Sequence, residues 1–271
     1  MSVIFGSRAW LGAIGRIAVT AIAVLSLVTT PAHAMRVSPM VLELSPTGGN
    51  SAGRIEVQNT TNANLAFETR VTRISFSEDG VATEVAADED FLIVPPQGVL
   101  PPGGRQVVRV QWVGRQPLTA SQSYYVSVNQ LPVAIDRPDG SGGAGQLQIV
   151  YHMKALVVVA PRDAQPNVSA VAARPTTIEV AATGEQPAHQ RPGVEVTLRN
   201  TGARHAFMSG ITWRIDGRDT SGRTLRVDIP SAELSTLIGT GYVGPNGAQR
   251  MFRVPVPQAF GPGPISVTFV Q

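Results

Sequence analysis

Short stretches in which apolar and polar residues alternate recur along the chain, and this pattern constrains the fold more than any other feature. The stretches carry β-branched or aromatic residues at every second position: Ile55/Val57, Val108/Val110/Trp112, Tyr124/Val126/Val128, Val194/Val196/Leu198, Ile211/Trp213/Ile215 and Ile265/Val267/Phe269. A period of two is typical of strands with one buried face. Turn residues separate the stretches, in keeping with 27 glycines and 21 prolines among 271 residues. The pattern predicts an all-β protein made of β-sandwiches, with one short helical turn at 232–238.

An internal similarity indicates two sandwiches of related topology. Residues 55–67 read IEVQNTTNANLAF, and residues 196–207 read VTLRNTGARHAF. Each stretch has a strand, an Asn-Thr turn and a second strand that opens with Ala-Phe, and the loops differ by one residue. We expect sandwich domains over 35–160 and 167–271, joined by a polar linker at 161–166 that begins and ends with proline.

Residues 1–34 have the layout of an export signal. Arg8 and Arg16 supply positive charge, an apolar run follows over Ile17–Val28, and Ala32-His33-Ala34 fits a cleavage site. The alternative is a membrane anchor, but the run is shorter than the ~20 apolar residues that a helical span needs. We therefore expect cleavage near Met35 and a soluble exported protein.

Charge and cysteine content exclude several classes of function. The chain has 22 basic and 19 acidic side chains, a net charge of +3, and two of the basic side chains belong to the expected signal. This balance provides no basic face for nucleic acid. Because the sequence contains no cysteine, disulfide scaffolds, thiolate metal sites and cysteine nucleophiles are excluded.

No residue pattern points to catalysis, to a cofactor or to a bound metal. The sequence has no zinc-binding histidine spacing and no nucleophile elbow or phosphate-binding loop. His152 lies in an expected strand, whereas His189 and His205 lie in polar loops. The acidic triplet at 88–90 lacks calcium-loop spacing, so a solvated loop is the favoured interpretation and a metal site the alternative. We expect a protein that is not an enzyme.

One expected strand is unusually long. Residues 146–160 read QLQIVYHMKALVVVA, and every odd position from Leu147 to Val159 is apolar. Typical strands run for about five or six residues. A glycine-rich loop at 136–145 precedes this one, and no charge or proline protects its edge before Lys154. The stretch fits either an ordinary central strand or a strand that pairs with another chain by β-augmentation.

Lys154 within this strand is the only lysine among the 22 basic residues. A lysine is a compact point charge on a flexible stem, and it can meet a carboxylate without the planar fork of an arginine. Lysine-specific chemistry is therefore one interpretation of this residue. A solvated side chain without a special role is the other.

Six stretches, taken together, are similar to a known family: 53–59 (GRIEVQN), 91–96 (FLIVPP), 100–104 (LPPGG), 108–112 (VRVQW), 124–132 (YYVSVNQLP) and 147–161. On these stretches the chain resembles, over 37–271, the periplasmic chaperones of the chaperone–usher pathway, the PapD-like superfamily. Within this family, the sequence is most similar to the archaic, Csu-type branch. The resemblance implies two immunoglobulin-like β-sandwich domains in a boomerang arrangement and a periplasmic location.

The resemblance also implies a function, which is donor-strand complementation of pilus or fimbrial subunits and their delivery to an outer-membrane usher. A pilin is an incomplete sandwich, and the chaperone lends it a strand. The donor residues would be Leu147, Ile149, Tyr151 and Met153, and the loop at 136–146 would order on binding. Self-association of the free form is another way to cover such a strand. No P-loop is present, so the energy for assembly would come from subunit folding.

In the family, a lysine at the position of Lys154 anchors the carboxylate of the subunit's C-terminus, together with an arginine in the first strand. Here the expected first strand, 37–44, contains no arginine. Arg36 and Arg109 are the candidates for the second cation. The alternative function is an exported structural or carbohydrate-binding immunoglobulin-like surface protein.

Overall fold

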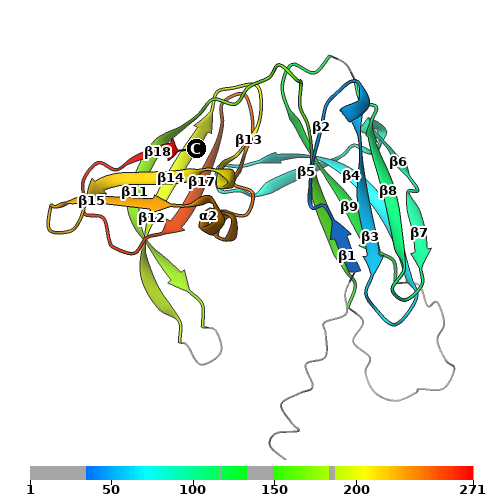
Figure 1. Ribbon diagram of the computed structural model, residues 1–271, viewed down its shortest axis with the longest axis horizontal. Coiled ribbons are helices and arrows are strands. Elements are labelled where there is room, and N and C mark those ends of the chain that lie inside the picture. Colours follow the sequence, from blue (N-terminus) through cyan, green and yellow to red (C-terminus); the bar gives the residue numbers. More distant parts are fainter. Residues whose placement is uncertain (1–34, 116, 133–148, 183–186, 271) are drawn as a thin grey trace, which may run out of the picture. The chain divides into compact units, whose positions relative to one another are not determined.

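The computed structural model describes residues 35–115, 117–132, 149–182 and 187–270, and Figure 1 labels its elements. The expected export signal, the loop at 136–146 and the predicted donor residue Leu147 lie outside the described residues. Within the described ranges, no helix has the length and apolar character that crossing a membrane requires.

Residues 35–159 form a sandwich of two sheets. The first sheet has the order β1-β3-β8-β6, which are Met35–Ser38, Ala52–Asn59, Arg105–Trp112 and Phe91–Val94. The second sheet has the order β2-β10-β9-β4-β5, which are Val41–Leu44, His152–Val159, Gln122–Gln130, Leu65–Phe76 and Ala82–Ala86, and β7 (Gln97–Leu100) also pairs with β4. Fully buried side chains from both sheets, such as Ile55 and Phe67, form the core between them.

The first strand contributes to both sheets. β1 pairs with β3 in one sheet, and after Pro39 the chain pairs as β2 with β10 in the other sheet, in parallel. The single strand expected at 37–44 is therefore two short strands. This change of sheet leaves β2 only four residues with which to cover β10.

Residues 168–270 form the second sandwich. One sheet has the order β11-β12-β17 (Val168–Val180, His189–Asn200 and Ala248–Pro255), and the other has the order β15-β14-β18 (Thr224–Ile229, Thr212–Arg218 and Ser266–Val270). A small pair, β13 (Ala206–Phe207) with β16 (Tyr242–Val243), and helix α2 (Ser231–Ile238) complete it. The paired strands β11 and β12 extend past β17, which pairs only with Gly193–Asn200 (Figure 1). The predictions of an all-β protein and of one helical turn are confirmed.

The two similar sequence stretches form the same kind of turn. In the first, the buried Asn59 donates from Nδ2 to the carbonyl of Ala63 (2.7 Å), and its Oδ1 accepts from the amide of Thr61 (2.9 Å). In the second, the buried Asn200 donates to the carbonyl of Arg204 (2.7 Å), and its Oδ1 accepts from the amide of Gly202 (3.0 Å). An asparagine that bonds the backbone two and four residues later explains why both turns need this residue.

The second asparagine turn also holds the segment between the two sandwiches. The amide of Asn167 donates to Asn200 Oδ1, and the amide of Thr201 donates to the carbonyl of Asn167, both at 2.9 Å. A Cβ at Gly202 would lie 2.3 Å from the carbonyl oxygen of Gln165. Only glycine fits there, because the turn and the segment approach so closely.

Polar side chains from both sandwiches also meet near β2. The guanidinium of Arg204 donates to Glu43 on β2 at 2.6 Å, and His205 Nε2 lies 3.6 Å from the same carboxylate. The ring of His205 is 2% exposed, and its Nδ1 lies 3.1 Å from Ser121 Oγ. His205 lies in a loop, as the sequence predicts, but the loop is not solvated at this residue, because the ring packs beside Tyr242 and Phe207.

The acidic triplet is only partly the solvated loop that the sequence predicts, because Asp88 and Glu89 are exposed whereas Asp90 is buried. It forms the 3-10 turn η2, Asp88–Asp90. Asp88 accepts from the amide of Val71 at 2.8 Å. The buried Asp90 accepts from the hydroxyl of Tyr124 at 2.9 Å and pairs with Arg73. Asp88 and Asp90 therefore tie η2 to β4 and β9.

Candidate functional site

β10 is the strand for which the sequence predicts a binding function, and the structure shortens it. The strand spans His152–Val159, whereas the alternation predicts 146–160. Its neighbour β9 ends at Gln130, whose amide donates to the carbonyl of Tyr151 at 2.9 Å. Among the described residues before Tyr151, no neighbouring strand continues the ladder of backbone bonds that defines a sheet. The strand therefore ends where its partner ends.

One side of β10 is covered along only half of its length. β9 pairs with the strand from His152 to Val159, but the pairing with β2 begins at Leu156. The amide of Leu156 donates to the carbonyl of Met40 at 2.9 Å, so even-numbered residues direct their backbone groups to this side. In the part of the chain that the structure describes, no strand pairs with this side of His152 and Lys154. We call residues 149–154 the open segment.

The odd-numbered side chains of β10 and of the three residues before it form an apolar stripe that continues from the core into solvent. Val157 is fully buried. Met153 and Tyr151 are partly buried and pack against the same core cluster. Ile149, the next odd residue, is 58% exposed. The core of the first sandwich thus opens along the predicted donor residues that the structure describes.

Lys154 lies on the other face of β10, at the end of the open segment. Its side chain is 44% exposed, and its ammonium donates to Glu84 Oε1 at 2.6 Å. The same ammonium lies 5.6 Å from the ring centroid of Tyr125, within the range of a cation–π contact. A carboxylate and an aromatic ring therefore hold the only lysine in one position.

Glu84 reaches this lysine from β5, which lies beyond β9 and β4 in the sheet. Its second oxygen, Oε2, accepts from the hydroxyl of Thr72 at 2.9 Å. The hydrogen bond from Lys154 is the main cause that lowers the pKa of the Glu84 carboxyl, and the bond from Thr72 adds to it against the opposing effect of desolvation. Glu84 is consequently ionised at neutral pH, and its contact with Lys154 is an ion pair.

The structure does not bring the two candidate arginines to Lys154. Arg36 on β1 and Arg109 on β8 alternate with buried neighbours, so both lie on the outer face of the four-stranded sheet. Arg109 donates to Gln111 Oε1 at 2.9 Å. Lys154 lies on the outer face of the opposite sheet, and the sheets of a sandwich pack about 10 Å apart. One carboxylate cannot touch Lys154 and either arginine at the same time.

The sequence analysis missed the groups that surround Lys154. Glu84, Thr72 and Tyr125 come from three different strands and have no shared motif. Their meeting depends on the strand order and on the register, in which Tyr125 pairs with both Thr72 and Leu156. The only signal available in the sequence was that a single acidic residue, Glu84, interrupts the short strand 82–86.

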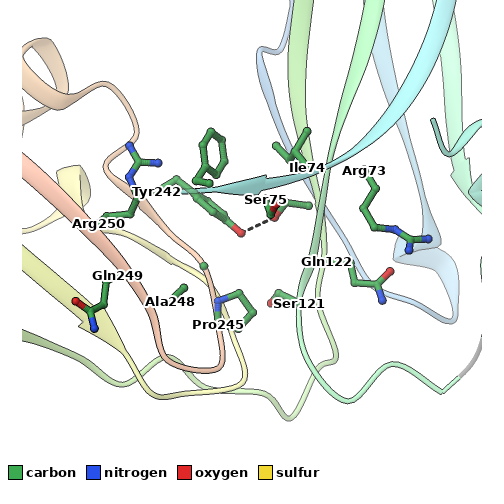
Figure 2. A pocket seen from close by; sticks show the side chains of 13 residues that line it. Arg73, Ile74, Ser75, Ser121, Gln122, Tyr242, Pro245, Ala248, Gln249 and Arg250 are labelled. Atoms are coloured by element: carbon green, nitrogen blue, oxygen red, sulfur yellow. Dashed lines mark hydrogen bonds between the residues drawn. The ribbon is translucent and has the colours of Figure 1, made fainter. Parts of the chain in front are cut away.

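A cavity of about 250 Å³ lies further along the same outer face (Figure 2). The end of β4, the start of β9 and the β16–β17 segment line it. The hydroxyls of Ser123 and Tyr242 share a buried hydrogen bond there. The guanidinium of Arg250 lies 4.9 Å from the ring centroid of Phe76, and its buried Nε has no hydrogen-bond partner among the described residues. None of the predicted site residues lines this cavity.

Comparison of the sequence with known families gives one match. Residues 37–165 match the family described as pili and flagellar-assembly chaperone, PapD N-terminal domain. The match contains the first sandwich except the first two residues of β1, and it contains the whole open segment. Residues 37–165 are a PapD-type chaperone domain. The first sandwich therefore belongs to a family of pilus-assembly chaperones, which is periplasmic and not enzymatic.

Solved structures with similar folds are also chaperones, at low sequence identity. A complex of the CsuC chaperone with the CsuE tip subunit from Acinetobacter baumannii is 13% identical, with 81% of this chain and 89% of that chain covered and a TM-score of 0.46. The Salmonella enterica SafB chaperone with the SafA pilin is 13% identical, with 89% and 98% covered and a TM-score of 0.48. The E. coli chaperone DraB is 12% identical, with 88% and 97% covered and a TM-score of 0.48. No curated protein sequence matches the chain.

Proposed function

We propose that this chaperone binds a pilus subunit along the open segment of β10 and completes the subunit's sandwich with its own strand. The observation that carries the proposal is the apolar stripe, which passes from the buried Val157 to the exposed Ile149 along a strand with one uncovered side. An incomplete sandwich offers the matching partner, because it lacks a strand and exposes both core and unpaired backbone. Addition of a strand covers the exposed core of the subunit and pairs its free backbone groups at the same time.

The apolar side chains supply most of the binding free energy in this account. Burial of one large apolar side chain stabilises by roughly 1.5–3 kcal/mol. Ile149, Tyr151 and Met153 are available, and Leu147 precedes them in the sequence. An exposed ion pair contributes only about 0–1 kcal/mol. Lys154 therefore serves to set the register, since a shift by one residue would turn the stripe away from the subunit.

Lys154 is the proposed anchor for a carboxylate at the end of the subunit chain. It lies next to the uncovered backbone of the open segment, and its ammonium is accessible to solvent. Arg109 and Arg36 remain the candidates for a second cation, and their alanine variants test whether either one takes part. Their position on the opposite sheet favours an anchor that consists of Lys154 alone.

Location and delivery complete the proposal. The sequence of 1–34 supports export by a cleaved signal, which places the mature chain in the periplasm. The chaperone would there hold pilin or tip subunits and pass them to an outer-membrane usher. Covering the open segment by self-association of the free chaperone is a further part of the proposal, because an uncovered apolar edge is prone to pairing.

Affinity capture tests this function. The tagged mature chain is recovered from the periplasm of its source bacterium, and the mass and sequence of any bound protein are determined. We expect one exported subunit of pilin size in stoichiometric amount. Ile149→Glu should abolish its retention, and Val99→Glu is the matched control, because Val99 is also 58% exposed but lies on β7, away from β10.

The outcomes separate the parts of the proposal. Normal capture by Ile149→Glu would overturn the donor role of the open segment. Normal capture by Lys154→Ala would leave the chaperone function and move the anchor elsewhere, with Arg109→Ala and Arg36→Ala as the next variants. Absence of any subunit while pili are made, together with binding to a glycan, would favour the carbohydrate-binding alternative.

A further inference from the structure

The contact between Lys154 and Glu84 occupies the place that the proposed function gives to the subunit's carboxylate. We propose that Glu84 is an internal competitor for Lys154, which occupies the lysine in the free chaperone and is displaced when a subunit presents its terminal carboxylate. This inference rests on the proposed function and concerns the regulation of the same site.

The geometry allows one carboxylate to replace the other. The Glu84 oxygen lies 2.6 Å from the ammonium, which is the distance of a charge-assisted hydrogen bond. The two side chains are 44% and 29% exposed, so an incoming carboxylate can reach the ammonium without unfolding of the sheet. An ammonium has three donors, and exchange can therefore pass through a state in which both carboxylates are bound.

Glu84 remains near the lysine after it is displaced. Thr72 Oγ1 holds the second carboxylate oxygen at 2.9 Å, and this bond does not involve Lys154. The pKa of Tyr125 is raised, first by burial and next by the charge of the nearby Glu84. The competitor can thus return to Lys154 as soon as the subunit leaves.

An internal competitor makes the lysine selective. A tethered group competes at an effective concentration in the millimolar range or above, so free carboxylates at lower concentration do not occupy the ammonium. A subunit whose apolar groove already engages Ile149 and Tyr151 is also held close to Lys154. Its terminal carboxylate therefore competes with Glu84 at a similarly high effective concentration. Lys154 would consequently respond to a carboxylate in the correct register and not to small anions.

The size of the effect follows from the strength of exposed ion pairs. Such pairs contribute about 0.2–1 kcal/mol, which corresponds to a change in affinity of about 1.5- to fivefold. Removal of the Glu84 charge should therefore tighten subunit binding by about this factor. The variant is Glu84→Gln, which keeps the shape of the side chain and an oxygen acceptor for Thr72.

A competition experiment measures this factor. Tagged variant and untagged wild-type chaperone are mixed in equal amounts with a limiting quantity of the subunit that the capture experiment recovers, and the share bound to each is determined. We expect Glu84→Gln to take about 1.5- to fivefold more subunit than the wild type, and Lys154→Ala to take less. Asp79→Asn is the matched control, because it removes one exposed acidic charge from the turn before β5 without a contact to Lys154.

A second set of measurements separates competition from a general effect of charge. In the Lys154→Ala background, Glu84→Gln should have no further effect, since the competed group is absent. Because the chain has a single lysine, ¹⁵N labelling of lysine gives one side-chain ammonium signal. We expect this signal to shift in Glu84→Gln and in the subunit complex, and to stay in place in Asp79→Asn.

Each result decides the inference. Equal capture by Glu84→Gln and wild type, with a loss in Lys154→Ala, would overturn the competitor and leave the anchor intact. Weaker capture by Glu84→Gln would also overturn it, because Glu84 would then support binding. Failure to recover any subunit would overturn the proposed function and this inference together.

Discussion

Residues 149–159, which are β10 and the three residues before it, form two halves with the same alternating sequence pattern and different surroundings. In the half from Ala155 to Val159, β9 and β2 lie on either side, and the odd-numbered side chains are fully buried. In the open segment only β9 is present, and its ladder ends at Gln130. The same stripe that forms the core in one half is thus left partly uncovered in the other.

The site therefore depends on where the neighbours of β10 begin and end. β2 begins only at Val41, because the chain first pairs as β1 in the opposite sheet. The uncovered side of the open segment is a consequence of this change of sheet. The same kind of substitution should therefore have different effects in the two halves.

The largest expected difference follows from placing the same charge in each half. Val157→Asp buries an unpaired carboxylate in the core and should lower the free energy of unfolding by more than about 4 kcal/mol. Ile149 is 58% exposed, so Ile149→Asp should change the free energy of unfolding by less than about 0.5 kcal/mol. Urea denaturation of both variants measures the effect. Similar losses in the two would remove the distinction between the halves.

Met153 lies where the two halves meet, and truncation of its side chain should affect both the stability of the protein and its binding of a subunit. Met153→Ala removes a partly buried side chain that packs against the core, so we expect a loss of about 1–2 kcal/mol in stability. The same truncation should weaken subunit binding by about tenfold. Denaturation and the competition experiment give the two values. If only stability or only subunit affinity changed, Met153 would contribute to the core alone or to the binding surface alone.

Acid should weaken the covered half selectively, through His205 beside β2. Burial lowers the pKa of this ring, and the charge of Glu43 on β2 opposes the shift. With a folded pKa below the ordinary value of about 6.5, the folded state binds the proton less readily than the unfolded state. Its contribution to stability is therefore present above pH ~6.5 and is lost as the pH falls below it.

The measurement is the urea midpoint as a function of pH between about 7 and 5. We expect the midpoint to fall on acidification in the wild type and to fall less in His205→Gln. His189→Gln is the control, because His189 is exposed. An equal acid dependence in His205→Gln and the wild type would show that this ring is not responsible.

The smallest expected effect is that of Lys154→Ala on subunit binding. Loss of an accessible ion pair should weaken binding by about fivefold or less at low salt, and by less still at high salt. The variant should leave the stability of the free chaperone nearly unchanged, since the Glu84 contact is also accessible. Binding measured at two salt concentrations tests this. A loss larger than that of Ile149→Glu would make the lysine and not the stripe the main source of affinity.

Much of the fold was predictable because it follows from local patterns. Alternation gave the strands, and the two Asn-Thr stretches indicated a repeated turn that the structure confirms through Asn59 and Asn200. Local patterns do not report which strands become neighbours. The length of β10 was therefore overestimated, since its extent depends on Gln130 and on β2.

The site was predictable in part for the same reason. The apolar stripe and Lys154 are features of one strand and are visible in the sequence. Glu84, Thr72 and Tyr125 meet Lys154 only through the register of four strands. His205 and Asp90 were assigned to solvent because polar residues usually lie there, whereas tertiary hydrogen bonds satisfy both in buried positions.

Amide hydrogen exchange in free and subunit-bound chaperone tests whether the open segment is an uncovered strand edge with which a subunit pairs. The amide of Leu156 is bonded to Met40, whereas those of His152 and Lys154 face the uncovered side of β10. In the free chaperone we expect the amides of His152 and Lys154 to exchange at least about a hundredfold faster than that of Leu156. Binding of a subunit should slow both to a rate similar to that of Leu156. Protection of these two amides in the monomeric free chaperone, or unchanged exchange in the complex, would contradict the account.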